Sequence, residues 1–390
     1  MISALVVNYN AEPALLSRCL ASLRAQTYPR LEILLVDNGS DPEPVDSIAA
    51  TYPDVRILRL GRNFGFAGGV NRGILAASGD LVLVSNFDVE LEADCLSQLA
   101  TVMGSDEGLA GVAPKTVFMH DQHLIDNVGT RIDTQMVAYH VGIGQLDLGQ
   151  YDVSEPAFGA CFAAALLRKS AFAPEAVGPL DGRYFMYYED VDWCYRANIL
   201  GWRFRTAPKA VVAHVHSASV RQFDYAFKHY LLERNLLHTV VKNLETPRMA
   251  RLVVRRSLAH LLRVCGRRPY WQAGLRAVAD FWRGVPRDWA PRAALQRRRR
   301  VPDRAIFALA AGETAHFDPV HLAPRYTLDA LEAMYRRRFA VTGDSRAGEI
   351  AASLRACRAR ANGEMRSRLV RELLRDEPPF VLDFVAKVGS

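Results

Sequence analysis

Short apolar runs alternate with stretches of helical spacing along the first part of the chain. The apolar runs cover residues 2–10, where the run ends in a turn, and residues 31–36, 55–60 and 81–85. Residues 13–26 and 68–77 carry apolar side chains at the spacing of a helix. Alternating strands and helices, with strands that are apolar almost throughout, indicate a parallel sheet covered by helices on both faces. We therefore predict an α/β fold with a doubly wound, mostly parallel sheet.

Polar residues follow the apolar runs, where the predicted strands end. They are Asn8 to Asn10, Asp37, Asn63 and Asp88. Ligands of doubly wound sheets bind outside the carboxyl ends of the strands, so these side chains are expected to converge on one crevice. Each residue taken alone is equally well explained as a turn former or a cap. Their occurrence at successive strand ends favours the binding crevice.

A glycine-rich segment at residues 61–73 leads into a predicted helix. Its five glycines allow close approach of the backbone, and a helix N-terminus favours anionic groups. The glycine spacing is that of neither a Walker loop nor a dinucleotide fingerprint, which disfavours a dinucleotide site. Asn86 and Asp88 close the next strand, where a carboxylate can hold a divalent cation that bridges a diphosphate.

Residues 210–217 predict a strand that ends in two histidines, His214 and His216. A histidine at such a place is more often a buried polar group with a satisfied hydrogen bond than a ligand. However, a metal site that begins at Asp88 needs a second ligand from a distant strand, and a histidine suits that purpose. Both interpretations stay open.

Three carboxylates, those of Glu189, Asp190 and Asp192, lie among aromatic residues in segment 184–196. Burial disfavours an ionised carboxylate and raises its pKa, which suits a general base near neutral pH. The alternative is a helix start, at which Glu189 and Asp190 face the N-terminal peptide groups and the aromatic residues form ordinary core. The segment alone favours the helix start, whereas the ligand crevice predicted above favours the base.

Taken in order, these segments resemble the inverting glycosyltransferases of family 2, which have the GT-A fold, and especially their rhamnosyltransferase-like branch. The resemblance rests on residues 6–10, 26–29, 36–40, 63–71, 86–88, 184–196, 214–219 and 234–235. Each segment alone is weakly specific, but all of them in the family's order are strongly specific. The resemblance implies a GT-A sheet flanked by helices, with a nucleotide-binding half at about 1–110 and an acceptor half at about 111–245.

The resemblance also implies roles for the acidic residues and the first histidine. Asp190 matches the family's catalytic base, and Glu189 and Asp192 are expected to support it. Asp88 and His214 are expected to hold a divalent metal, Mn²⁺ or Mg²⁺.

A further set of residues is implied to bind the nucleotide-sugar donor. Asp37 is expected to bind the pyrimidine base, and Asn86 the ribose or the metal. Asn86 stands where the stricter family pattern has a first carboxylate. The full donor-binding set is Asn8, Tyr9, Asn10, Asp37, Asn63, Gly68, Gly69, Asn71, Asn86, Trp193 and Arg234.

The implied reaction is a single displacement that inverts the anomeric centre and uses no protein nucleophile. The branch suggests transfer of L-rhamnose from dTDP-rhamnose to a hydroxyl of a glycan, lipid-linked or other acceptor. UDP-galactofuranose and other UDP-sugars are the alternative donors.

Two other classes of protein stay open. A nucleotidyltransferase usually carries a basic, glycine-rich phosphate segment near its N-terminus, and residues 8–23 lack one. A GT-A-like binding protein without activity is expected to lack Asp190, Asp88 or His214, and this chain has all three.

The positive charge of the chain is concentrated in its C-terminal part. The whole chain carries +7, whereas residues 245–390 carry +14 and residues 1–244 carry −7. In the C-terminal part, 28 of the 29 basic residues are arginine. We therefore predict a catalytic domain at 1–245 and a basic, mainly helical region at 246–390.

The basic region begins with a predicted amphipathic helix at residues 247–264. Tryptophans at 271, 282 and 289 follow, and then an arginine run at 297–300. Basic helices with aromatic residues suit an anionic membrane surface. The alternative is an arginine-rich helical cap packed on the catalytic domain. A nucleic-acid surface is disfavoured because the aromatic residues are not interleaved with a sheet or loop module.

Cysteine usage and the N-terminus bear on localisation. The six cysteines form no CxxC pair, which argues against a zinc site or a disulfide framework and fits a reducing cytoplasm. The chain starts with an apolar strand, so we expect no cleaved signal peptide. No run reaches the roughly 18 apolar residues of a membrane span. We expect a cytoplasmic protein, located at the inner face of the membrane if the tail binds lipid.

Overall fold

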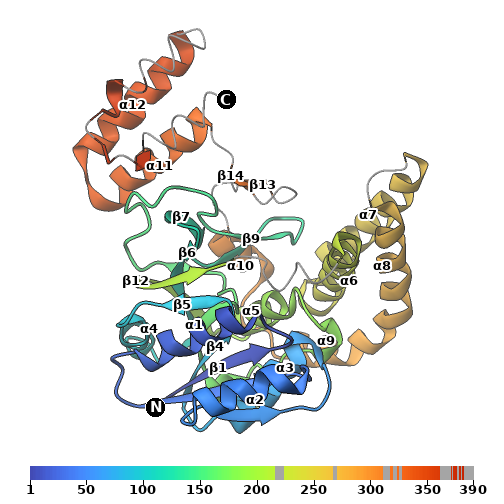
Figure 1. Ribbon diagram of the computed structural model, residues 1–390. Helices are drawn as coiled ribbons and strands as arrows, with labels where there is room; N and C mark the ends of the chain where they lie inside the picture. The colour runs from blue at the N-terminus through green and yellow to red at the C-terminus, as the bar shows by residue number, and fades with distance from the viewer. Residues whose placement is uncertain are drawn as a thin grey trace.

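A central sheet covered by helices dominates the computed structural model, and further helices follow toward the C-terminus (Figure 1). This confirms the predicted α/β architecture. The structure describes residues 1–215, 224–266, 270–310, 317–318, 323–324, 327–360, 370, 372–375, 377–378 and 380–381. His216 lies outside these residues. Among the helices so described, none is both long and apolar enough to cross a bilayer.

The sheet combines parallel strands with several antiparallel ones. Its strands are β1 (Ile2–Asn8), β2 (Leu31–Asp37), β3 (Arg56–Arg59), β4 (Leu81–Asn86), β5 (Val89–Leu91), β6 (Leu109–Phe118), β7 (Asp121–Asn127), β10 (Pro156–Ala157), β11 (Ala164–Arg168) and β12 (Arg203–His214). The order is β10-β12-β6-β11-β4-β1-β2-β3, with β5 beside β12 and β7 beside β6. β3, β2, β1 and β4 are parallel neighbours, while β11 runs antiparallel between β4 and β6.

Helices cover both faces because side chains alternate across each strand. The helices over the sheet are α1 (Pro13–Arg24), α2 (Pro42–Thr51), α3 (Gly65–Ala76), α4 (Cys95–Gly104) and α5 (Glu189–Ile199). A further helix, α6 (Tyr225–Asn243), packs against α5 and the helices that follow it. Leu5 and Val7 of β1 join the core that includes α3, α5 and α6. Ala4 and Val6 join the opposite core, which includes α1 and α4.

The glycine-rich segment differs from its prediction, because α3 begins at Gly65 and not at residue 68. Four of its five glycines therefore lie within a helix that packs closely on β1. A Cβ atom at Gly73 would collide with Leu5, and one at Gly69 would lie 3.0 Å from Val7 Cγ1. The absence of side chains at these positions lets the helix approach the strand.

A small hairpin stands apart from the main sheet. It consists of β8 (Thr130–Ile132) and β9 (Ala138–His140), which pair antiparallel. The backbone N–H of Thr130 donates to the carbonyl of Gly159 at 2.9 Å, which ties the hairpin to the segment before β11. This hairpin carries His140, a residue of the site described below.

The C-terminal region is mainly helical, as predicted, but it packs in two separate places. Its elements are α7 (Thr246–Cys265), α8 (Trp271–Gly284), α9 (Trp289–Arg297), α10 (Asp303–Ala310), β13 (Phe317–Asp318), β14 (Ala323–Pro324), α11 (Leu328–Thr342) and α12 (Ser345–Arg360). Residues of α7 to α10 share the core of α5 and α6. Residues of α11 and α12 form another core with Phe118, Leu124 and the segment that follows β9.

Buried polar contacts join the two sides of residue 245. Arg292 donates to the carbonyls of Val241 and Leu244, both at 2.6 Å. Asp303 accepts the Tyr195 hydroxyl at 3.1 Å and the backbone N–H of Glu245 at 2.9 Å. Residue 245 therefore marks a change in charge along the chain but no break in its packing.

Candidate active site

The ends of β1 and β2 meet at one edge of the sheet, as the sequence predicts. Asn8 lies opposite Asp37 in the parallel register. The Asn8 amide donates to Ser40 Oγ at 3.1 Å, and Ser40 N–H donates to Asp37 Oδ1 at 3.0 Å. Asn10 also donates its backbone N–H to Ser40 Oγ, at 3.0 Å. Tyr9 is half-buried between the two asparagines.

Asn38, which was not singled out from the sequence, joins this strand end to α3. Its side chain is buried and donates to Asn63 Oδ1 at 3.1 Å and to the Gly65 carbonyl at 3.0 Å. Its oxygen accepts the N–H of Phe64 at 3.0 Å. In the sequence, Asn38 is marked only by its place in segment 36–40, one of the segments that resemble the family. The Asn38 side chain thus links Asn63 to the end of β2.

Three other predicted donor contacts on α3 serve packing instead. Gly68 and Gly69 are buried, and a Cβ at Gly68 would lie 2.6 Å from that of Phe64. The Asn71 amide donates to the Leu180 carbonyl at 2.8 Å and accepts the Leu180 N–H at 2.9 Å. Asn71 therefore fastens α3 to the segment before α5, and both polar atoms of its side chain are engaged by the chain itself.

Asp88 and His214 meet where β5 and the end of β12 run side by side. β12 places His214 opposite Val89, and Val215 N–H donates to the Asp88 carbonyl at 3.1 Å. His214 Nε2 lies 3.6 Å from Asp88 Oδ1. The Asp88 side chain is 1% exposed, and within the described part of the chain neither carboxylate oxygen accepts a hydrogen bond. A buried carboxylate is costly without a donor or a cation.

The His214 imidazole is held on its other side by Asp126 of β7. Asp126 Oδ2 lies 2.7 Å from His214 Nδ1, and Asp126 Oδ1 lies 3.7 Å from His140 Nδ1. Burial opposes protonation of His214, but the flanking carboxylates of Asp126 and Asp88 raise its pKa to about 10. Sequence reasoning missed Asp126 and His140, because their contacts join strands far apart in the chain and no local pattern marks them.

Glu189 and Asp190 stand at the N-terminus of α5, so the predicted helix start is present. Asp190 accepts the N–H groups of Val191 at 2.8 Å and of Phe162 at 3.5 Å. Burial raises the pKa of Asp190, although these N–H groups and the charge of His140 oppose the shift. Burial and the Asp190 charge raise the pKa of Glu189 well above its ordinary value.

Two links join Asp190 to the strand ends that carry the metal candidates. The first is His140, whose charge acts on Asp190 from β9. The second is the segment before β11. Phe162 N–H points to Asp190, and the next residue, Ala163, accepts the N–H of Asn86 at 2.8 Å. The predicted base and the predicted metal-binding end of β4 therefore contact the same short segment.

Trp193 was predicted to contact the donor, and this prediction is wrong. Its side chain is fully buried, and its Nε1–H donates to the Gly178 carbonyl at 2.9 Å. Its ring stacks on Phe172 with a centroid distance of 4.4 Å. Trp193 is a core residue behind the site.

Asp192 is also fully buried, and both of its oxygens are engaged by other side chains. Lys242 Nζ lies 3.0 Å from Oδ1, and the Asn243 amide donates to the same oxygen at 2.9 Å. Arg196 Nε donates to Oδ2 at 3.0 Å. Burial opposes ionisation, but Lys242 and Arg196 outweigh it, so the pKa of Asp192 is lowered. Asp192 therefore fastens α5 to α6 and has no oxygen left for substrate.

The segment before α5 has an unusual backbone, held by Arg234 and Asn235. Three non-glycine residues have φ between 66° and 68°: Phe185, Tyr187 and Tyr188. The Asn235 amide donates to three carbonyls of residues 184–187 at 2.7 to 3.0 Å. Arg234 donates to the carbonyls of residues 183 and 184 at 3.1 and 3.0 Å. Arg234, predicted to bind the donor, instead supports a strained segment of the kind found at functional sites.

The described residues contain no group of three or more His, Cys, Asp or Glu side chains that could hold a metal ion by themselves. Asp88 and His214 would provide two protein ligands. Hard cations commonly complete their coordination with phosphate oxygens and water. The pair therefore fits a cation shared between the protein and a diphosphate.

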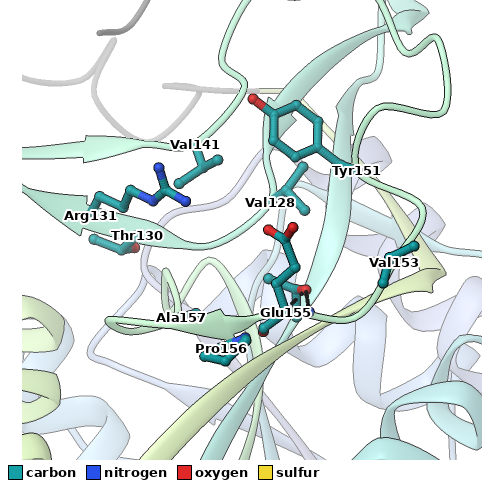
Figure 2. Close-up of a pocket in the computed structure, with 10 residues that line it drawn as sticks. Val128, Thr130, Arg131, Val141, Tyr151, Val153, Glu155, Pro156 and Ala157 are labelled. Atoms are coloured by element: carbon teal, nitrogen blue, oxygen red, sulfur yellow. Dashed lines mark hydrogen bonds between the residues drawn. The ribbon is translucent and has the colours of Figure 1, made fainter. Parts of the chain in front are cut away.

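A pocket lies beside β8 (Figure 2). Its lining residues are Val128, Thr130, Arg131, Val141, Tyr151, Val153, Glu155, Pro156, Ala157 and Thr206. None of them belongs to the predicted site. Arg337 of α11 pairs with Glu155 at 2.7 Å and lies over the Tyr151 ring. This pocket therefore adjoins the place where α11 contacts the catalytic part.

Comparison with known proteins places the chain in a family. The model of the family described as glycosyl transferase family 2 matches residues 3–173. The chain is 30% identical over 236 residues to an N-acetylglucosaminyl-diphospho-decaprenol L-rhamnosyltransferase of Mycobacterium tuberculosis strain H37Rv, covering 55% of this chain and 76% of that protein. It is 26% identical over 245 residues to the low-salt glycan biosynthesis hexosyltransferase Agl10 of Haloferax volcanii, covering 60% and 73%.

A solved structure supports the fold. The crystal structure of GalNAc-T7 with UDP, GalNAc and Mn²⁺ matches with a TM-score of 0.50 and 16% identity, covering 62% of this chain and 48% of that chain. The chain belongs to glycosyltransferase family 2 and is a glycosyltransferase with the GT-A fold.

Proposed function

We propose that this glycosyltransferase moves L-rhamnose from dTDP-rhamnose to a hydroxyl of a glycan or lipid-linked acceptor, with inversion at the anomeric carbon. The mycobacterial relative is an N-acetylglucosaminyl-diphospho-decaprenol L-rhamnosyltransferase, which supports L-rhamnose as the sugar and a lipid-linked acceptor. The proposal rests on two hydrogen bonds made by neighbouring residues. Phe162 N–H donates to the Asp190 carboxylate, and the carbonyl of the next residue, Ala163, accepts the N–H of Asn86, two residues before Asp88.

Asp88 and the Nε2 atom of His214 would hold a divalent cation, Mn²⁺ or Mg²⁺. The fit rests on the buried carboxylate oxygens of Asp88, which accept no hydrogen bond within the described residues. Asp126 fixes Nδ1 of the imidazole, so that Nε2 points to Asp88. When bound, the cation would neutralise charge on the leaving diphosphate.

Asp190 would accept the proton of the acceptor hydroxyl as that oxygen attacks the sugar. Its pKa is raised by burial, which makes it a better proton acceptor than an exposed carboxylate. The N–H groups of Val191 and Phe162 orient its two oxygens. Burial and the charge of Asp190 raise the pKa of Glu189 well above its ordinary value, so Glu189 would favour its neutral form beside an ionised Asp190.

The donor nucleotide would lie along the ends of β1 and β2. The hydrogen bonds among Asn8, Asn10, Asp37 and Ser40 give that edge a fixed shape before a ligand arrives. A preformed polar edge of this kind suits recognition of a pyrimidine base.

A donor panel tests the proposal and its alternatives. The purified chain is incubated with dTDP-rhamnose, UDP-galactofuranose and UDP-hexoses, each with Mn²⁺, with Mg²⁺ or with EDTA. Thermal shift measures binding, since a specific ligand stabilises the folded state by mass action. Released phosphates identify the reaction.

The expected result is stabilisation by dTDP-rhamnose with metal, together with release of dTDP. Preference for a UDP-sugar would replace the donor and keep the chemistry. Release of pyrophosphate would indicate a nucleotidyltransferase. Binding without any turnover, across acceptors, would indicate a GT-A-like binding protein.

A further inference from the structure

The α7–α8 hairpin projects away from the sheet and carries a surface that the proposed reaction does not use (Figure 1). The inner side of α7 is well packed, with Leu252, Val253 and His260 buried. A Cβ at Gly274 of α8 would lie 2.5 Å from His260 Nδ1, so the two helices are in close contact. The hairpin is therefore an ordered part of the fold with a distinct outer side.

The outer side of α7 exposes large apolar residues on successive turns. Val254, Leu258, Leu261 and Leu262 are 55%, 53%, 52% and 71% exposed. Positions 254, 258 and 261 follow the helical repeat, so they form one stripe, with Leu262 beside it. Single exposed leucines are ordinary, but a contiguous row on one projecting helix marks an interaction surface.

Arginines border this stripe, and no acidic residue does. The sequence of α7 contains five arginines and no aspartate or glutamate. Arg251, Arg255 and Arg263 are exposed, and no ion pair with a described carboxylate is found for them. By contrast, the half-buried Arg256 is paired with Glu233 at 2.9 Å. The outward arginines thus present positive charge that no described acidic residue neutralises.

Aromatic residues stand near both ends of the hairpin. Tyr270, just before α8, is 41% exposed, and Trp282, near the end of α8, is 51% exposed. Tyrosine and tryptophan are favoured where an apolar layer meets water, because their rings are amphipathic.

We propose that the outer face of α7, formed by Val254, Leu258, Leu261 and Leu262 with Arg251 and Arg255, docks on an anionic phospholipid bilayer. The leucine stripe would enter the boundary between headgroups and acyl chains while the arginines contact lipid phosphates. A second copy of the chain fits this face less well, because a two-fold interface would bring the same arginines together. Bilayer docking depends on this surface and not on the donor or acceptor, so vesicle binding and sugar transfer can be tested separately.

Vesicle binding of the full chain tests the proposal. Co-sedimentation is measured with phosphatidylcholine vesicles and with vesicles containing about 30% phosphatidylglycerol. Wild-type protein is expected to bind the anionic vesicles and to be released as salt rises, since salt screens exposed charges. The double variant Leu261→Glu/Leu262→Glu is expected to lose about tenfold or more of the partition coefficient. The double variant Arg251→Glu/Arg255→Glu is expected to lose binding to anionic vesicles to a similar extent.

The matched control carries the same kinds of change on another surface. Leu75 of α3 is 83% exposed and Arg30 is exposed, so Leu75→Glu/Arg30→Glu should leave vesicle binding unchanged. All variants should keep the wild-type melting temperature and the wild-type thermal shift with donor nucleotide. Equal loss in the control, or unchanged binding in the α7 variants, would overturn the proposal. A change of mass in analytical ultracentrifugation caused only by Leu261→Glu/Leu262→Glu, without any vesicle binding of wild type, would assign the face to self-association instead.

Discussion

Buried polar side chains at two sets of strand ends in the same sheet differ in whether they are hydrogen-bonded. At the ends of β1 and β2, the amides of Asn8 and Asn38 are engaged by neighbouring groups of the chain. Near the ends of β4 and β12, both oxygens of Asp88 are buried without a hydrogen-bond donor among the described residues, and Glu189 Oε2 is in the same condition. Folded proteins rarely leave such groups unpaired, so the first set is a preformed scaffold for the proposed donor nucleotide, whereas the second is where a cation is expected.

The largest effect is expected at Asp190. Asp190→Asn keeps the shape of the side chain and removes the proton acceptor, so the rate of sugar transfer should fall by about 10²–10⁴-fold. Nucleotide binding, measured by thermal shift or calorimetry with donor and metal, should stay at the wild-type level. Near-normal turnover of this variant would remove Asp190 from the role of base.

The next effect concerns Asp126, which holds the imidazole of His214. Asp126→Asn removes the charge behind the imidazole, and such supporting groups typically change metal affinity by about 10–100-fold. Titration with Mn²⁺ followed by electron paramagnetic resonance would measure the loss without requiring turnover. Asp121→Asn, on the same strand but half-buried, is the control and should bind Mn²⁺ like the wild type. Unchanged affinity in Asp126→Asn would detach Asp126 from the metal side.

A stability measurement separates the scaffold from the reactive side. Asn38→Ala leaves its buried partners unpaired and should lower the free energy of unfolding by about 1–3 kcal/mol. Asp88→Asn should cost less when both are measured in EDTA, because Asp88 accepts no hydrogen bond from a described donor. Urea unfolding of the two variants checks the difference. A larger loss of unfolding free energy in Asp88→Asn than in Asn38→Ala would contradict the difference drawn between the two sets of strand ends.

The smallest effect on rate is expected at Glu189. Burial and the Asp190 charge raise the pKa of Glu189, which favours its neutral form beside an ionised Asp190, and Glu189→Gln imitates that form. Its rate should stay within about tenfold of the wild type, well above that of Asp190→Asn.

The pH dependence of turnover follows from the same pair. The base must be ionised, and burial raises the pKa of Asp190 above its ordinary value, so kcat/KM should fall as pH falls through that raised pKa. A pH–rate profile that stays flat down to the ordinary range of an exposed aspartate would contradict this assignment.

Much of the fold could be predicted because its information is local. The apolar runs at β1, β2 and β4 indicate buried parallel strands, and the polar residues that follow them mark the carboxyl edge of the sheet. Asp88, His214 and Asp190 were singled out because each follows a strand or starts a helix and because the family resemblance implied a role for each; those roles stay predictions. The change of net charge at residue 245 predicts a domain boundary. No sequence pattern indicates that Arg292 is buried against the carbonyls of Val241 and Leu244.

Other residues could not be assigned from sequence for two physical reasons. Neighbours on a helix point in different directions, so Asp190 faces the segment before β11 while Asp192 and Trp193 pack against α6 and the core. The second reason is that pairing between distant strands leaves no local signal. Asp126 and His140 entered the site only through such pairing.

The most direct test of the central claim is a crystal structure of the chain with Mn²⁺ and a nucleoside diphosphate. We expect Mn²⁺ to be bound by an Asp88 carboxylate oxygen and His214 Nε2. The diphosphate should lie on the metal, and the Asp190 carboxylate should face the same cavity. Mn²⁺ bound without either side chain, or a diphosphate bound on a surface remote from Asp190, would contradict the central claim.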